Sequence, residues 1–270
     1  MKKVFAAGIL AAAVLLNISF ASAESLGKST SYNTANLSSG IIALAYDAQT
    51  DARLKVLVEK DGKRVSYDLK NDGTVESFPL QMGDGEYKVS ILENVVDTKY
   101  RYISTEKVNL DLEDDRQVYL ASVQNVNWTR DMVAIKKADE LVKGLETDKQ
   151  KIDVIYDYLV SNITYDYAKL KTLQSGYLPN IDNTITTKKG ICYDYASLFA
   201  SMLRSQGIPA KLVKGYATKV TGYHAWNEVY NRETGKWIII DTTYDAEMKQ
   251  HKAGYSMEKN AADYDKVYEY

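Results

Sequence analysis

A lone cysteine at the expected start of a helix constrains this chain more than any other feature. Cys192 is the only cysteine in 270 residues. Apolar side chains then recur at i, i+4, i+7 and i+8, the spacing of a buried helix face, at Tyr195, Phe199, Met202 and Leu203. Gly207 and Pro209 supply a helix stop. A thiol at a helix start faces unpaired backbone N–H groups and the positive end of the helix dipole, which favour thiolate. The alternative is an inert buried cysteine.

Residues 1–23 have the pattern of a signal peptide. Two lysines precede an apolar run from Val4 to Phe20, and a small-x-small cleavage site ends at Ala23. A retained membrane anchor is the weaker alternative, because two polar residues interrupt the run. We therefore expect cleavage after Ala23 and a secreted protein with no membrane span in the mature chain.

Charge and cysteine content exclude several classes of function. A net charge of −2 gives no electrostatic reason to expect a nucleic acid or an anionic membrane surface as partner. A single cysteine cannot form a disulfide within one molecule, so an exported chain that keeps one has a reactive thiol or an intermolecular partner. No Cys/His cluster has zinc-ligand spacing, and the Asp-Gly pairs lack the full calcium-loop pattern. We expect no metal and no cofactor.

The chain divides into two expected domains. Residues 24–37 are rich in Ser, Thr and Asn and resemble a flexible lead-in. Residues 38–125 alternate apolar and polar side chains between Gly/Asp turns such as Asp61-Gly62, which predicts an antiparallel β-sandwich. Helical periodicity begins after Trp128, which places a second domain at residues 126–270. The predicted fold class is α+β.

Three strands are expected after the cysteine helix, at Ala210–Ala217, Tyr223–Tyr230 and Lys236–Thr242. The last two are close enough to form a hairpin. A register that pairs Tyr230 with Gly235 also pairs His224 with Asp241, with Cβ atoms about 5 Å apart. The segment 164–189 is expected to be irregular and to line the approach to the site.

A thiol, an imidazole and a carboxylate are the groups that a cysteine acyl-transfer site needs. The only other histidine, His251, lies in a polar tail without an acidic neighbour of its own. The alternatives are a structural histidine at His224 and a turn-forming aspartate at Asp241. Their occurrence together with Cys192 favours the functional interpretation.

Three segments resemble, in order, the motifs of the transglutaminase-like superfamily: Gly190–Pro209, Tyr223–Val229 and Trp237–Thr243. The resemblance covers roughly residues 130–248. In that family a cysteine on a helix and a histidine and an aspartate on two strands form the triad of a papain-like fold. The leading β domain also looks like the N-terminal part of exported bacterial members.

The resemblance implies that Cys192 is the nucleophile, His224 the base and Asp241 the residue that orients it. Trp226 matches the family's His-x-Trp position and either contacts substrate or fills the core behind the histidine. Tyr165 is a candidate oxyanion donor, on its position upstream of the cysteine.

Animal cross-linking transglutaminases have Trp directly after the nucleophile and Trp three residues before the histidine, where this chain has Tyr193 and Thr221. We therefore expect an exported cysteine enzyme that hydrolyses peptide or amide bonds, with a peptide or protein as substrate and cell-wall or surface peptides as candidates. A protein-glutamine transglutaminase with amine acceptors is one alternative. A non-catalytic peptide-binding module on the same fold is another.

Overall fold

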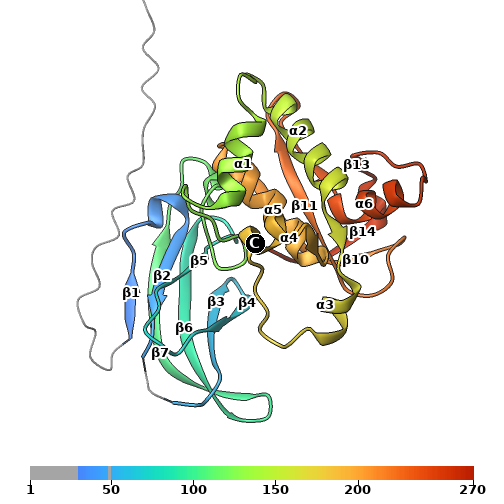
Figure 1. Cartoon of the computed structure of the whole chain (residues 1–270). Helices are drawn as coiled ribbons and strands as arrows, with labels where there is room; N and C mark the ends of the chain where they lie inside the picture. Colours follow the sequence, from blue (N-terminus) through green and yellow to red (C-terminus); the bar gives the residue numbers. More distant parts are fainter. Residues whose placement is uncertain (1–29, 48–49) are drawn as a thin grey trace, which may run out of the picture.

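The structure, a computed structural model, describes residues 30–47 and 50–270. The expected signal peptide and its cleavage site lie outside the described residues. Two halves lie side by side (Figure 1): a β half, formed by β1–β7, and an α+β half, formed by α1–α6 and β8–β14. Among the described helices, none is both long and apolar enough to cross a membrane.

The β half consists of two antiparallel sheets, in the orders β1-β2-β5 and β4-β3-β6-β7. Their strands are β1 (Ser31–Asn33), β2 (Ile41–Ala45), β3 (Leu54–Lys60), β4 (Lys63–Leu69), β5 (Glu76–Pro79), β6 (Gly85–Val96) and β7 (Lys99–Leu110). The rings of Phe78 in one sheet and Tyr67 in the other lie 5.1 Å apart. The expected antiparallel sandwich is therefore present. Within the segment expected as a flexible lead-in, β1 is a paired strand.

The expected turn at Asp61-Gly62 forms, with φ of 49° and 78° at its two residues. Positive φ at both central residues is the geometry of the tight hairpin turn that Asp-Gly favours. Short helical turns at Leu37–Ser39 and Asp115–Tyr119 flank the strands of the β half.

Six helices are described in the α+β half: α1 (Val133–Leu141), α2 (Asp148–Asn162), α3 (Tyr167–Thr172), α4 (Ile181–Thr187), α5 (Cys192–Ser205) and α6 (Thr242–Gln250). The segment 164–189 was expected to be irregular, and this prediction is wrong. The segment holds α3, α4 and the parallel pair β8 (Thr164–Tyr165) and β9 (Lys189–Gly190). Side-chain caps explain both helices. Asp166 accepts from the N–H of Lys169, and Asn180 accepts from that of Asn183.

A five-stranded antiparallel sheet supports α5. Its order is β13 (Glu258–Lys259), β12 (Lys236–Ile240), β11 (His224–Asn231), β10 (Ala210–Ala217) and β14 (Tyr264–Glu269). Every residue of α5 after Cys192 is buried. Asn227 of β11 donates to the carbonyl of Ala196 in α5 at 2.9 Å, which fixes the helix against the sheet. A short helical turn at Ala261–Asp263 leads into β14.

The β11–β12 hairpin has a different register from the expected one. Tyr230 pairs with Trp237, and the loop is 232–235 rather than 231–234. Gly235 adopts φ 68°, and its N–H donates to the carbonyl of Asn231 at 2.9 Å, so the glycine belongs to the turn. The shift moves each partner by two residues, which keeps every side chain on its expected face.

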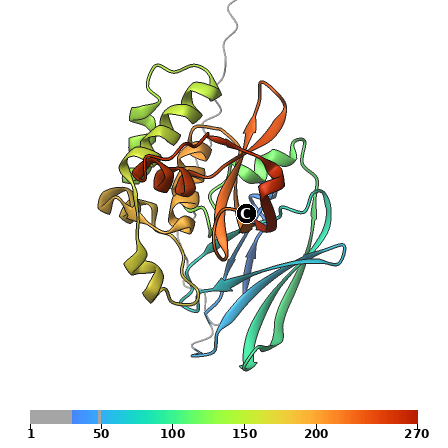
Figure 2. The same ribbon diagram turned by 90° about the vertical axis from the view of Figure 1, so that its right-hand side faces the viewer.

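The buried guanidinium of Arg204 joins α5 to the segment that links the two halves and to the central sheet. It donates to the carbonyls of Ala210 at 2.8 Å, Ala121 at 2.7 Å and Tyr270 at 2.8 Å. The Tyr270 ring lies 5.6 Å from that of Tyr67 in the β half, where the C mark stands in Figure 1. Figure 2 shows the β half below the α+β half from a second direction. The α+β class expected from the sequence is confirmed.

Candidate active site

Cys192 is the first residue of α5, and its side chain is partly exposed. The carboxylate of Asp194, which is fully buried, accepts from the N–H of Ile191 at 2.9 Å and so caps the helix. Lys169 pairs with the same carboxylate at 2.7 Å. A Cβ at position 190 would lie 2.7 Å from the Cβ of Asp194, so only glycine fits two residues before the cysteine. The local sequence therefore fixes the thiol at the helix start.

His224 and Asp241 are in direct contact. Nε2 of the imidazole lies 2.7 Å from Oδ2 of the carboxylate, and both side chains are buried. They are not cross-strand partners, because pairing of β11 with β12 ends at Asn227 and Ile240. Asp241 instead caps α6, where its Oδ1 accepts from the N–H of Tyr244 at 3.0 Å.

The Cys192 side chain lies close enough to the imidazole to contribute to the raised pKa of His224. Because Nε2 faces Asp241, this leaves Nδ1 for the thiol. Burial opposes protonation of the ring, but Asp241 and Cys192 outweigh it and raise the pKa of His224 to about 10. The histidine is therefore an imidazolium at neutral pH, a proton donor placed beside the sulfur.

A third side chain, that of Tyr264, joins the His224–Asp241 pair. This contact was not predicted from the sequence. The Tyr264 hydroxyl donates to Oδ2 of Asp241 at 3.0 Å. It belongs to β14, which lies beside β10 in the sheet. No local motif marks this tyrosine, because the contact depends on how a strand near the end of the described chain joins the sheet.

Tyr165, the candidate oxyanion donor, lies beside the start of α5. Its hydroxyl lies close enough to the backbone N–H of Cys192 for that group to act on the pKa of Tyr165. Burial, with smaller contributions from Cys192 and Glu247, raises the pKa of Tyr165, so the hydroxyl keeps its proton at neutral pH. The same hydroxyl can donate to an oxygen atom that the N–H also serves.

Trp226 is 1% exposed and stacks behind His224, with ring centroids 6.2 Å apart and planes at 28°. Its other neighbour is the ring of Tyr264, at 5.0 Å. Because Trp226 is buried, it exposes no surface to a substrate. Of the two roles predicted for it, it has the second, which is to fill the core behind the histidine. His251 lies exposed at the C-terminal end of α6.

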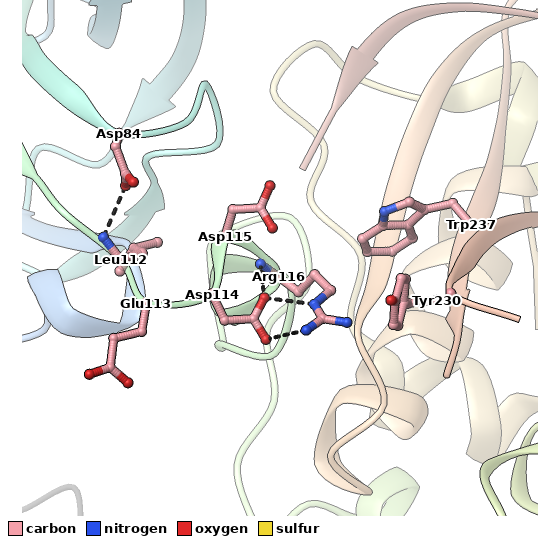
Figure 3. Close-up of a pocket in the computed structure, with 9 residues that line it drawn as sticks. Asp84, Leu112, Glu113, Asp114, Asp115, Arg116, Tyr230 and Trp237 are labelled. Carbon is pink, nitrogen blue, oxygen red and sulfur yellow. Dashed lines mark hydrogen bonds and ion pairs between the residues drawn. The ribbon is translucent and has the colours of Figure 1, made fainter. Parts of the chain in front are cut away.

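A cavity of about 600 Å³ lies between the β half and the β11–β12 hairpin. Figure 3 shows Asp84 and its neighbours on one side and Tyr230 with Trp237 on the other. Arg116 packs over the Tyr230 ring, 4.4 Å from its centroid. Neither the thiol nor the His224–Asp241 pair is among the groups that line this cavity.

Residues 135–242 match the family model described as the Transglutaminase-like superfamily. The matched range includes Cys192, His224 and Asp241 and ends at the first residue of α6.

Three curated relatives match parts of the chain. A UPF0252 protein of Methanocaldococcus jannaschii is 30% identical over 128 residues, which cover 44% of this chain and 36% of the relative. The uncharacterized protein YebA of Bacillus subtilis is 33% identical over 111 residues, 34% of this chain and 15% of the relative. A protein-glutamine gamma-glutamyltransferase of Pseudomonas aeruginosa is 36% identical over 75 residues, 23% and 11% respectively. The alignments thus span about a third or less of the relatives' length.

Two solved structures show the extent of structural similarity. The periplasmic domain of TgpA from Pseudomonas aeruginosa aligns with a TM-score of 0.38 and 14% identity, over 86% of this chain and 100% of that one. Red sea bream transglutaminase aligns with a TM-score of 0.33 and 12% identity, over 75% and 47%.

Proposed function

Because residues 135–242 match the family model of the Transglutaminase-like superfamily, we propose that this protein is a cysteine-dependent acyl-transfer enzyme that hydrolyses peptide or amide bonds. One observation carries the proposal: the buried His224–Asp241 pair faces Cys192 at a helix start. A helix start, an imidazole and an orienting carboxylate together activate a thiol as a nucleophile.

The reaction follows from these positions. The Cys192 thiolate attacks the carbonyl carbon and forms a C–S bond. The C–N bond then breaks, and the imidazolium of His224 gives its proton to the leaving amine. In the second half a water molecule attacks the thioester, His224 takes its proton, and the acid product leaves the restored thiolate. Asp241 holds the imidazole orientation throughout.

Charge that develops on the carbonyl oxygen needs donors that are already in place. The backbone N–H of Cys192 is one, as in other acyl-transfer sites built at a helix start. The hydroxyl of Tyr165 is the second in this proposal, since it lies close to that N–H.

Hydrolysis is proposed over amine transfer because an amine must compete with water at about 55 M, which requires a bound amine and limited water entry. In cross-linking members tryptophans form the wall of such a site. Here Trp226 is buried behind the histidine, and Trp237 lines the separate cavity near Tyr230. At the wall position stands Thr221, which is exposed.

Export and substrate class complete the proposal. The pattern of residues 1–23 supports secretion after cleavage behind Ala23. The substrate in this proposal is a peptide or protein, with cell-wall or surface peptides as the first candidates.

The test is incubation of the secreted protein with peptide libraries, with and without millimolar dansyl-cadaverine, and mass spectrometry of the products. A matched Cys192→Ala variant is the control. We expect hydrolysed peptides to exceed amine adducts and both to vanish in the control. A majority of adducts would identify a transglutaminase. If neither product forms and electrophilic peptides do not label Cys192, the protein is not an enzyme of this kind, and the non-catalytic peptide-binding module remains as the interpretation.

A further inference from the structure

Lys214 of β10 places an ammonium group beside the proposed nucleophile. In the sheet it pairs with Ala225, the residue after His224. Its Nζ lies 3.6 Å from the ring centroid of Tyr193, which follows Cys192 in α5, and 5.0 Å from that of Tyr270. Burial lowers the pKa of Lys214 to about 8, and a charge on Cys192 opposes that shift. The sulfur is therefore near enough for its charge to act on the ammonium.

This ammonium has no carboxylate partner among the residues that the structure describes. In the part of the chain that the structure describes, no carboxylate oxygen lies within the 4.0 Å limit of an ion pair with Lys214. By contrast Lys211, three residues earlier on the same strand, has Glu269 at 3.2 Å and Glu228 at 3.7 Å. Aromatic faces attract a cation less strongly than a carboxylate does. Since Lys214 is only partly buried, an anion from outside can supply the missing charge.

Exposed tyrosines surround the approach to Lys214. Tyr216, Tyr223 and Tyr268 are 53%, 49% and 42% exposed. Tyr223 directly precedes His224 and meets Tyr216 edge to face at 5.5 Å, while Tyr268 pairs with Lys214 across the sheet. We call these three residues the tyrosine rim. Flat, amphipathic rings are well suited to hold a peptide chain while the carboxylate lies deeper.

We propose that Lys214 determines specificity by binding a carboxylate of the acyl donor next to the scissile carbonyl, while the donor peptide lies on the tyrosine rim. The inference rests on the proposed function, because it assumes that Cys192 is the nucleophile. It names the substrate class as peptides with an Asp or Glu side chain, or a free terminal carboxylate, close to the bond that reacts.

Two alkylating agents of nearly equal size test this without knowledge of the natural substrate. Iodoacetate and iodoacetamide both form an S–C bond at Cys192 and release iodide, and only iodoacetate carries a carboxylate. The measurement is the ratio of their second-order rate constants, divided by the same ratio for N-acetylcysteinamide as a neutral free thiol. We expect the wild-type protein to favour iodoacetate about tenfold, the size of one nearby, partly screened charge.

Matched variants assign the preference to Lys214. Lys214→Met keeps the aliphatic stem between the rings and should lose most of the preference, whereas Lys214→Arg should keep it. Lys236→Gln removes the same charge from an exposed position at the far end of β12 and should leave the ratio unchanged. The His224 imidazolium also attracts anions, so it is the difference between variants that isolates Lys214.

The outcomes separate this inference from the proposed function. If Cys192 reacts with iodoacetamide no faster than the free thiol, the nucleophile itself is wrong. If it reacts fast but the wild-type ratio equals that of the free thiol, or Lys214→Met leaves the ratio within twofold, the role of Lys214 is refuted. A lysine that only stabilised thiolate would speed both reagents equally. A wild-type ratio near that of the free thiol overturns the inference even where no variant folds.

A second arm identifies the source of the carboxylate. Peptides found to react are compared in matched pairs, Glu against Gln and C-terminal acid against C-terminal amide. We expect one pair to differ by about tenfold in kcat/KM in the wild type and by less than twofold in Lys214→Met. No difference in either pair would contradict carboxylate recognition.

Discussion

The two ends of β11 carry two different sets of charged groups. At its start, His224 meets Asp241, with Cys192 and Lys214 nearby. Further along, Glu228 belongs to a set that we call the Glu228 cluster, made of Glu228, Lys211, Lys266 and Glu269. In this cluster Lys266 lies 3.0 Å from Glu228 and 2.6 Å from Glu269, and Lys211 lies 3.2 Å from Glu269.

The two sets differ in whether every charged group has a partner of opposite charge within the protein. Each charge of the Glu228 cluster has an opposite charge within β10, β11 or β14, so the cluster joins three strands and leaves no group for a ligand. At the start of the strand, Asp241 is fully bonded, but the thiol is partly exposed and Lys214 lacks a carboxylate among the described residues. Ionic groups with complete partners stabilise structure, and those with an open position can act on a substrate.

The largest expected effect is that of Asp241→Asn. The amide still accepts from the N–H of Tyr244, so the cap of α6 remains, but it favours the wrong imidazole tautomer. Activity should fall by about 10⁴-fold, as the corresponding change does in a serine protease. Turnover of a reactive peptide and thermal unfolding are measured together. Retained activity within tenfold of the wild type would contradict the role of Asp241.

The pH profile sharpens the comparison next. With the pKa of His224 raised to about 10, kcat/KM should stay level through neutral pH and fall about tenfold per pH unit above pH 10 as the proton donor is lost. The folded pKa lies above the unfolded value of about 6.5. Protonation of His224 therefore stabilises the fold fully below pH 6.5, and this contribution is lost as the pH rises through 10. An alkaline limb near pH 6.5 would refute the pairing.

Tyr264→Phe removes one hydrogen bond to Asp241 and keeps the ring that packs on Trp226. A loss of about 1 kcal/mol in positioning should lower kcat about fivefold with little change in KM. Steady-state kinetics separates the two constants. Equal loss in a Tyr102→Phe control, at an exposed position of β7 in the β half, would show that the effect is not specific to Asp241.

Glu228→Gln should lower stability and leave activity nearly unchanged, the opposite of what is expected for Tyr264→Phe. It removes one charge from a cluster whose side chains are 12% to 38% exposed, so the free energy of unfolding should fall by about 1 kcal/mol. Activity should stay within twofold, because no member of the cluster touches the thiol. Urea unfolding and peptide turnover measure the two quantities. If activity fell more than the reduced fraction of folded protein can explain, the two ends of β11 would be coupled.

The smallest effect is expected from His251→Ala. This histidine is exposed at the end of α6 and is the only other histidine in the chain. Turnover should match the wild type within error. An inactive His251 variant with a normal fold would transfer the role of base from His224.

Local sequence patterns determined the position of the thiol. Gly190, Cys192 and Asp194 lie within five consecutive residues, so the helix start and its cap follow from interactions between near neighbours. The same holds for the bounds of β10, which run from Ala210 to Ala217 as expected. Interactions over three or four residues depend on the chain alone, and such elements can be predicted from periodicity.

Tertiary structure decided how the remaining groups meet. The sequence predicted that His224 and Asp241 would be close, but through a strand register that does not form. The contact arises because Asp241 leaves the strand to cap α6. Tyr264 and Lys214 join the site through the placement of β14 and β10 in one sheet. A side chain's partners across a sheet depend on register and topology, which many distant contacts fix together, and no short stretch of sequence contains that information.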